Sequence, residues 1–453
     1  MKHNIILVLM ILITATATTV RTKVFGQSVR TLSLKEAINM SITNSKQLKS
    51  SYAKSEEAIA ALREAVQNRL PAVSVSGSYL RLNHAHLNLK TKPGNTGNTG
   101  GSGGSTTSSA NPSSALYGIA NVSLPLFSGF RIKYGIESSK YLAEAAHLDA
   151  DNDREAVIMN TIEAYENLYK SKAAVDLVKE NLESNRQRVK DFSNLEKNGL
   201  MARNDLLKAE LQESNTELSL LDADNNWKLA NINMDLMLGL HDSTVLAVNE
   251  NDLQPASVQL KGAADYVQSG LQNRKDVSAL SYRQKSANTG IKIAKAAIYP
   301  SVALTGGYVA ANIPNILTVT NAVNIGVGVQ YNLNLGKNNS QVQQAKAREK
   351  QAVANQEMLT DQIQLEVNQA YQNYLLSRKK IEVYNQAIAQ AEENYKIVKN
   401  KFDNALATAT DLLDADVAQL QARLNAASAK ADASVAYNKL LQTAGLLDDT
   451  QNK

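Results

Sequence analysis

Residues 324–335 read NIGVGVQYNLNL, and this stretch decides what kind of fold the chain has. Apolar side chains occupy every second position, whereas the positions between them carry only asparagine, glutamine and glycine. Successive side chains of a β-strand point to opposite faces, so the pattern predicts a strand with one apolar and one polar face. Similar alternation surrounds Val75, Val122 and Leu304. The sequence therefore predicts four strands, at about 71–82, 117–128, 301–311 and 323–335.

Two interpretations of these strands are open. A soluble sheet with one solvated face would show this alternation. Transmembrane β-strands of about ten residues would show it too, with apolar side chains toward lipid and small polar ones toward a lumen. Tyrosines near the strand ends favour the second interpretation, and so does an export signal expected at residues 1–26. There, Lys2 precedes an apolar run that is shorter than the ~20 residues of a membrane-spanning helix. An uncleaved membrane anchor is the alternative for this segment.

Long helices are expected beside the strands. Residues 132–198 and 337–404 contain no proline and little glycine, and ~65 residues at 1.5 Å per residue form a helix of roughly 100 Å. From Ile381 to Phe402 an apolar seam has heptad spacing, which predicts packing against neighbouring helices. All helices predicted from the sequence lie at about 33–70, 132–198, 204–238, 263–299, 337–404 and 409–446.

The chain repeats one pattern twice. Asn44-Ser45-Lys46 matches Asn273-Arg274-Lys275 at a shift of 229 residues, and Asp205-Leu206-Leu207 matches Asp411-Leu412-Leu413 at a shift of 206. The first copy therefore carries 23 extra residues, around 91–114, where glycine, asparagine, serine and threonine predict a flexible loop. The expected segments are a signal peptide at 1–26, a first repeat at 27–240, a linker at 241–262, a second repeat at 263–447 and a tail at 448–453.

Composition limits the possible functions. With 48 basic and 43 acidic residues the chain is too balanced for a dedicated nucleic-acid binder. A mean hydropathy of −0.29 excludes a polytopic helical membrane protein. The chain has no cysteine and only five histidines, which argues against thiolate chemistry and histidine-rich metal sites. No nucleophile–base pair or nucleotide loop is recognisable. The sequence thus predicts no enzyme and no cofactor.

Four strands in lipid would require an oligomer. An open sheet leaves two edges of unsatisfied N–H and C=O groups, each costing several kcal/mol in a membrane. Two chains would supply eight strands and a barrel filled by side chains, whereas three would supply twelve and leave a lumen. The polar strand faces and the long polar helices favour three chains.

The segments LSLKEAI (32–38), LPAVSVSGSY (70–79) and LPLFSGFR (124–131), with the two DLL turns, resemble the TolC family of outer-membrane efflux channels. The resemblance implies a homotrimer in the cell outer membrane: a 12-stranded transmembrane β-barrel continued by a long α-helical coiled-coil barrel in the periplasm. It implies the passive conduit of a tripartite efflux or export system, with a periplasmic adaptor and an inner-membrane pump as partners. On the residues alone, a periplasmic coiled-coil scaffold or binding protein without a pore is the alternative.

The resemblance also implies the site residues. Asp205, Asp411 and Asp414 match aspartates that ring the periplasmic aperture of the family and favour cations. Aspartate is also favoured near a helix N-terminus as a cap and by the helix dipole, and the two roles are compatible.

The expected aperture departs from the family pattern at three positions. Phe402 stands where the family has a hydrogen-bonding tyrosine, and Ala407 stands where it has a gate-locking arginine. Lys208 occupies the place in the first repeat that Asp414 occupies in the second. The polar lock of the aperture is therefore expected to differ from that of the family.

Overall fold

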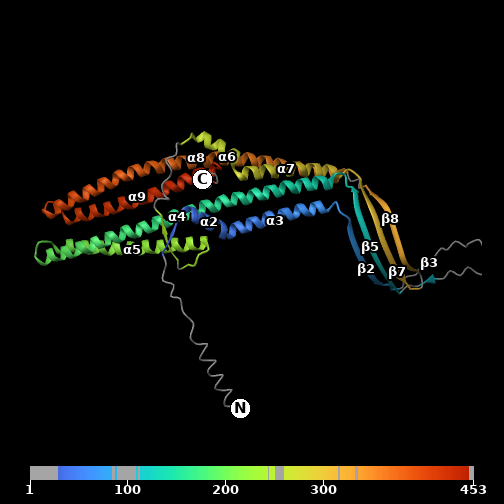
Figure 1. The fold of residues 1–453 in the computed structure, drawn as a ribbon, viewed down its shortest axis with the longest axis horizontal. Coiled ribbons are helices and arrows are strands. Elements are labelled where there is room, and N and C mark those ends of the chain that lie inside the picture. The colour runs from blue at the N-terminus through green and yellow to red at the C-terminus, as the bar shows by residue number, and fades with distance from the viewer. Residues whose placement is uncertain are drawn as a thin grey trace, which may run out of the picture. The chain divides into compact units, whose positions relative to one another are not determined.

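The computed structural model describes residues 29–83, 87–88, 109–110, 113–242, 244–249, 260–314, 317–331 and 335–447. The expected signal peptide, most of the loop at 91–114 and the tail at 448–453 lie outside these residues. Helices and strands follow one another in the order (Figure 1) β1 (Val29–Leu32), α2 (Leu34–Asn44), α3 (Lys46–Gln67), β2 (Ala72–Arg81), β3 (Leu87–Asn88), β4 (Ser109–Ala110), β5 (Ser114–Phe127), α4 (Arg131–Lys197), α5 (Arg203–Leu238), β6 (Val245–Val248), α6 (Ala263–Asn273), α7 (Lys275–Ala296), β7 (Ser301–Ile313), β8 (Leu317–Gln330), α8 (Leu335–Asp403) and α9 (Ala409–Thr443).

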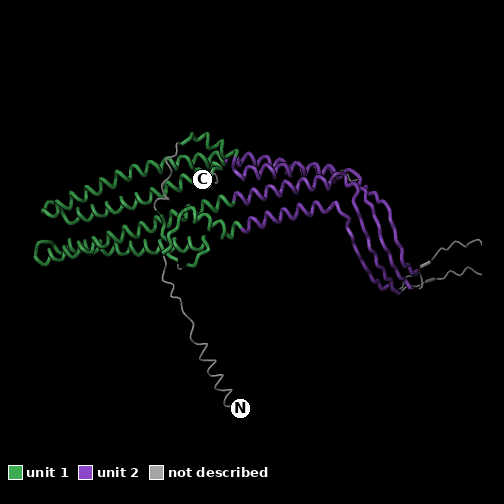
Figure 2. The backbone as a smooth tube through the Cα atoms, viewed as in Figure 1, with its two compact units in different colours: residues 1–48, 153–272, 363–453 green, residues 49–152, 273–362 purple. Residues whose placement is uncertain are grey.

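The chain divides into two compact units (Figure 2). Unit 1 contains residues 1–48, 153–272 and 363–453, and unit 2 contains residues 49–152 and 273–362. The two long helices α4 and α8 contribute residues to both. In the described part of the chain, no helix is apolar over enough of its length to cross a membrane.

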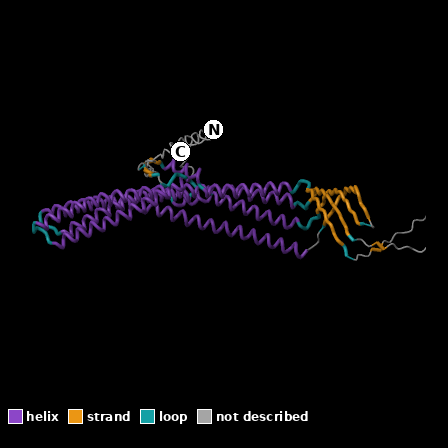
Figure 3. The backbone as a smooth tube through the Cα atoms, turned by 90° about the horizontal axis from the view of Figure 1, so that it is seen from below, coloured by secondary structure: helices purple, strands orange, loops and turns teal. Residues whose placement is uncertain are grey.

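The larger sheet of unit 2 has the strand order β2-β5-β7-β8, visible as the group of four long strands in Figure 3. Every neighbouring pair in this sheet is antiparallel. The outer strands β2 and β8 each pair on one side only, so this sheet has two free edges within the described part of the chain.

The register separates the two faces of this sheet. One row joins Val75 to Ala120, Ala120 to Tyr308 and Tyr308 to Val323. The neighbouring row joins Ser74 to Asn121, Asn121 to Gly307 and Gly307 to Asn324. The apolar face is open in the single chain, where Val75 is 79% and Ile325 is 81% exposed. Alternation in the sequence thus corresponds to one apolar and one polar face.

Strand β8 differs from the expected strand at 323–335. It begins earlier, at Leu317, and it ends at Gln330, whose partner on β7 is Ser301. The residue before that partner is Pro300, which has no N–H to donate to a further rung. The alternation nevertheless continues in the sequence to Leu335, which is the first residue of α8. Alternation alone therefore placed the end of this strand wrongly.

The helices expected at 33–70 and 263–299 are each broken. The first break lies at Ser45, where ψ is 118° and the Ser45 hydroxyl accepts a hydrogen bond from Leu48 N at 3.1 Å. The second lies at Arg274, which has ψ 133° and makes no side-chain cap. These residues occupy matching places in the two repeats. Helical periodicity does not reveal such a break, because α2 and α3, like α6 and α7, both continue the apolar spacing.

Two small sheets were not expected from the sequence. In unit 1, β1 pairs in parallel with β6, which lies inside the segment expected to be a linker. The Tyr165 hydroxyl ties them to α4: it donates to Leu32 O at 2.9 Å and accepts from Asn249 N at 3.2 Å. Trp227 packs against the apolar cluster that contains Leu32, Tyr165 and Leu246. The other small sheet pairs β3 with β4.

Candidate functional site

The candidate site lies in unit 1, at the turns that join α4 to α5 and α8 to α9. Gly199 in the first turn and Ala405 in the second both adopt the left-handed conformation, with φ of 70° and 58°. In each turn the next residue, Leu200 or Leu406, donates its N–H to the carbonyl five residues earlier, at 2.9 and 2.7 Å. Both helices therefore end in a Schellman motif.

An apolar cluster brings the two turns together. The rings of Phe192 on α4 and Phe402 on α8 lie with their centroids 5.3 Å apart, at an interplanar angle of 32°. The buried members of this cluster come from both helical hairpins and are Phe192, Leu206, Ala209, Ala409, Leu412 and Leu413. Phe402, predicted as an aperture residue, thus packs its ring against a phenylalanine. Its side chain offers no polar group.

Asp205 lies in the first turn of α5 and is half-buried. The N-cap of that helix, Ala202, makes no side-chain hydrogen bond. Asp205 is the acidic residue of the first turn, where the helix dipole favours a negative charge. The Lys208 ammonium lies 3.4 Å from Asp205 Oδ1 and donates to Thr410 Oγ1 on α9 at 2.9 Å. Lys208 therefore links the two hairpins beside the turns.

Asp411 forms a capping box at the start of α9. Its carboxylate accepts from Thr408 N at 2.9 Å, and its own N–H donates to the Thr408 hydroxyl at 3.2 Å. The backbone hydrogen bond from Thr408, followed by that of the Thr408 hydroxyl, lowers the pKa of the Asp411 carboxyl below its ordinary value. The capping role considered from the sequence is thus present at this position.

Asp414, one turn further along α9, has a different environment. It is exposed and makes no hydrogen bond or ion pair to the part of the chain that the structure describes. Ala407 lies in the turn before α9 and offers no polar side chain. The three aspartates therefore differ: one is bonded to its own helix cap, one faces a lysine, and one is free to act on solvent ions.

A buried ion pair joins the two hairpins further from the turns. Arg188 on α4 and Asp416 on α9 are 7% and 3% exposed and lie 2.9 Å apart. Burial lowers the pKa of the Arg188 guanidinium, but the hydrogen bond and charge of Asp416 outweigh it and raise the pKa. Further hydrogen bonds connect Arg188 Nη2 to Tyr395 Oη (3.3 Å), Arg188 Nη1 to Asn185 Oδ1 (2.6 Å), Asn181 Nδ2 to Asp416 Oδ2 (3.0 Å) and Asn185 Nδ2 to Thr216 Oγ1 (2.9 Å).

Sequence patterns did not identify this network. The heptad seam gives Tyr395 an apolar position and assigns no role to Arg188 or Asp416. One signal was present: Asn185 interrupts an otherwise apolar seam on α4, and a polar side chain at such a position needs a buried partner. The residues around Asn185 bind α4, α5, α8 and α9 to one another.

The chemically relevant groups at this site are charged side chains in fixed positions. The described residues contain no group of three or more side chains suited to hold a metal ion. The carboxylates and the ammonium beside the turns can attract or repel ions, and the polar links hold the two hairpins together.

Sequence comparison identifies relatives of the chain. The outer membrane efflux protein family matches residues 37–240 and 266–446. The outer membrane efflux protein BepC of Brucella suis biovar 1 (strain 1330) is 22% identical over 332 residues, which cover 72% of this chain and 71% of BepC.

Solved structures with this fold include outer membrane proteins of two bacteria. VceC of Vibrio cholerae superposes with a TM-score of 0.72 at 19% identity, covering 91% of this chain and 96% of VceC. The CmeC outer membrane channel of Campylobacter jejuni superposes with a TM-score of 0.73 at 18% identity, covering 91% of this chain and 86% of CmeC.

Proposed function

Because the chain belongs to the outer membrane efflux protein family, we propose that three copies of it form a passive channel that carries solutes across the outer membrane. The family membership agrees with the resemblance seen in the sequence and places the protein in the outer membrane. In the proposed assembly, twelve strands form a closed barrel and the long helices continue it as a tunnel in the periplasm. A periplasmic adaptor and an inner-membrane pump deliver the solutes, and the channel itself performs no catalysis.

The observation that carries the proposal is the sheet of unit 2. Its apolar face is open, its opposite face is lined by serine, asparagine and threonine, and its outer strands have free edges. Free edges cannot stay unpaired in lipid, because each unsatisfied backbone group costs several kcal/mol there. Pairing β8 of one chain with β2 of the next satisfies both edges and turns the apolar face outward. A barrel of twelve strands leaves an open lumen, whereas side chains would fill the interior of a barrel of eight strands.

The aspartates beside the two turns serve the entrance of this channel. In a trimer, Asp205, Asp411 and Asp414 bring nine carboxylates toward the three-fold axis, accompanied by three Lys208 ammonium groups. The excess of negative charge favours cations. The links Lys208–Thr410 and Arg188–Asp416 hold the hairpins of each chain together and replace the polar lock that Phe402 and Ala407 do not provide.

Fractionation and conductance test the proposal. The protein should remain in the outer membrane fraction until detergent is added, run as a trimer in detergent, and give stepwise currents in planar bilayers. Release by osmotic shock alone, with no conductance, would instead support a periplasmic scaffold.

A further inference from the structure

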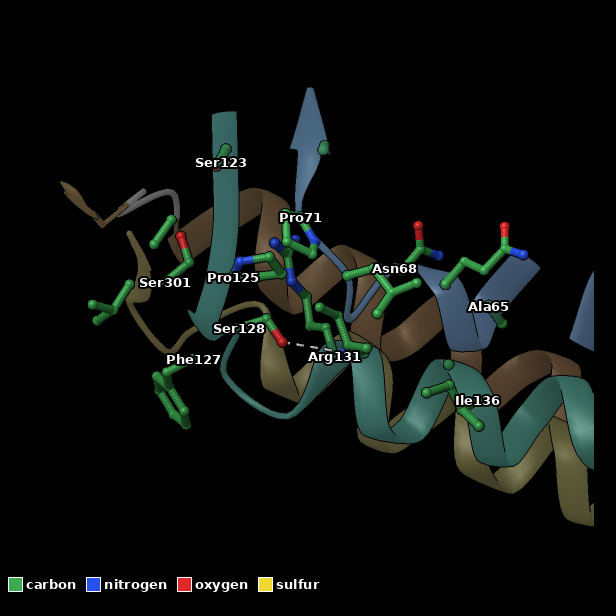
Figure 4. Close-up of a pocket in the computed structure, with 17 residues that line it drawn as sticks. Ala65, Asn68, Pro71, Ser123, Pro125, Phe127, Ser128, Arg131, Ile136 and Ser301 are labelled. Atoms are coloured by element: carbon green, nitrogen blue, oxygen red, sulfur yellow. Dashed lines mark hydrogen bonds between the residues drawn. The ribbon is translucent and has the colours of Figure 1, made fainter. Parts of the chain in front are cut away.

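Unit 2 contains a groove where its strands meet its helices, which we call the Arg131 groove. It has a volume of about 620 Å³ and lies between the end of α3, the start of α4 and the strand ends. Figure 4 shows the side chain of Arg131 extending from the start of α4 toward those strand ends.

The charge in this groove is uncompensated. The Arg131 guanidinium makes no hydrogen bond or ion pair to the described part of the chain, and no carboxylate is among the residues that line the groove. Hydroxyl and amide groups surround it instead, from Asn68, Ser123 and Ser301. A guanidinium with five N–H donors and no carboxylate beside it is suited to bind an oxyanion through two parallel hydrogen bonds.

The register shows on which face of the sheet the groove opens. Ser123 pairs with Thr305 and lies two residues from Asn121, so it belongs to the polar face. Ser301 and Ala303 also line the groove and share that face, whereas Val302 and Phe127, which pair with each other, line it from the apolar face. The serine hydroxyls that the strands contribute to the groove therefore belong to the face that turns toward the lumen when the apolar face meets lipid.

We propose that the Arg131 groove binds soluble oxyanions, such as phosphate, sulfonate or carboxylate groups, as they pass through the channel, with Arg131 as the binding cation. The inference rests on the proposed function, because it needs the polar face to line a conduit. Three such groups, one from each chain, form a ring of positive charge at the junction of strands and helices. This ring lets a conduit whose entrance favours cations also accept solutes that carry anionic groups.

Block of single-channel currents by inorganic pyrophosphate tests the assignment. Wild-type channels are compared with Arg131→Gln and with Lys133→Gln, which removes the same charge from the same helical turn but lies outside the groove lining. Loss of a charge-assisted hydrogen-bond pair should raise the half-blocking pyrophosphate concentration roughly tenfold for Arg131→Gln. Lys133→Gln should leave it within about twofold, since an exposed charge near the site contributes only screened attraction.

Each other outcome has a definite meaning. Equal block in the two variants would overturn the assignment. If anionic lipid, relative to zwitterionic lipid, weakens block of the wild type but not of Arg131→Gln, a lipid headgroup occupies the groove, and this would also overturn the assignment. If Arg131→Gln does not assemble, Arg131→Lys, which keeps the charge without the planar fork, should bind pyrophosphate less tightly than wild type. Absence of any current would refute the proposed function instead.

Discussion

Arg188 and Asp416 form an ion pair with a separation of 2.9 Å, and both side chains are nearly inaccessible to solvent. They belong to different helical hairpins, α4–α5 and α8–α9, so the pair fixes one hairpin against the other. Burial removes both charges from water, and the folded state tolerates this only while each charge is compensated by the other.

Removing one partner of this ion pair should therefore destabilise the protein more than removing both partners. We expect Arg188→Met to destabilise the protein by about 3–5 kcal/mol, because Asp416 would stay buried without its cation. The double variant Arg188→Met/Asp416→Leu should be more stable than Arg188→Met alone. Thermal unfolding in detergent, followed by circular dichroism, measures the order of the three proteins. A double variant that is no more stable than Arg188→Met alone would show that the two charges do not depend on each other.

The two turns allow a paired test of backbone strain. Ala405 holds φ at 58°, a conformation that costs an L-residue roughly 1 kcal/mol and glycine nothing. Gly199 holds φ at 70°, and a Cβ added there would meet no atom within 4 Å, so only the backbone conformation opposes a side chain. Ala405→Gly should stabilise the second turn slightly, and Gly199→Ala should destabilise the first by about 1 kcal/mol. Amide hydrogen exchange at the turns would report both. Stability changes of the same sign in Ala405→Gly and Gly199→Ala would contradict the argument from backbone strain.

The sequence predicted more of the fold than of the site. Alternation around Val75 and Ile325 indicated the two sheet faces because strand side chains point up and down in turn. The break at Ser45 and the pairing of β1 with β6 were missed because they depend on a local cap and on contacts distant in sequence. At the site, the DLL repeat located Asp205 and Asp411. Thr410 and Asp416, which bind Lys208 and Arg188 across the hairpins, lie on another helix, and spacing along one helix cannot identify them.

The two sheet faces should respond in opposite ways to a charge. Ile325→Arg places a cation on the apolar face, where a basic residue near mid-bilayer costs roughly 2–4 kcal/mol. Asn324→Arg, one residue away at the same depth, places it on the polar face, where water surrounds it. We expect trimer assembly, assayed by native electrophoresis of membrane extracts, to fail for the first and to persist for the second. Equal assembly of the two would reverse or abolish the assignment of lipid and lumen.

Asp235 on α5 should make stability depend on pH. The side chain is 0% exposed, one carboxylate oxygen has no hydrogen-bond partner in the described structure, and the other accepts from Asn231 Nδ2 at 2.9 Å. Burial, and then the charge of Asp242, raise the pKa of Asp235 from 3.8 to about 6, although His241 opposes this.

A raised pKa means that the folded state favours the protonated acid. Protonation of Asp235 therefore favours folding. This contribution to the stability of the folded state is complete below about pH 4 and is lost as the pH rises through about 6. At neutral pH, Asp235→Asn should therefore stabilise the protein by up to about 2–3 kcal/mol, and it should make unfolding less dependent on pH in this range. Denaturant unfolding of wild type and variant at several pH values checks both statements. Parallel pH profiles for the two proteins would exclude Asp235 as the titrating group.

The last prediction concerns the charges beside the two turns. Replacing Asp205, Asp411 and Asp414 together by asparagine removes nine negative charges from the proposed trimer. Asparagine caps helices about as well as aspartate, and at position 411 its Oδ1 can still accept from Thr408 N. Cation selectivity should fall, seen as a shift of the reversal potential toward zero in a salt gradient across a planar bilayer.

Lys208→Gln should have the opposite effect. It removes the ammonium that lies 3.4 Å from Asp205 and leaves that carboxylate uncompensated, so cation selectivity should rise. The same change removes the link from Lys208 to Thr410, and channels should then spend more time open if this link holds the hairpins together. Thr410→Val separates the two effects, because it removes the link and keeps the charge. For the triple substitution of Asp205, Asp411 and Asp414, an unchanged reversal potential in assembled trimers would be the contradicting result. The three aspartates would then act as helix caps with no influence on permeating ions.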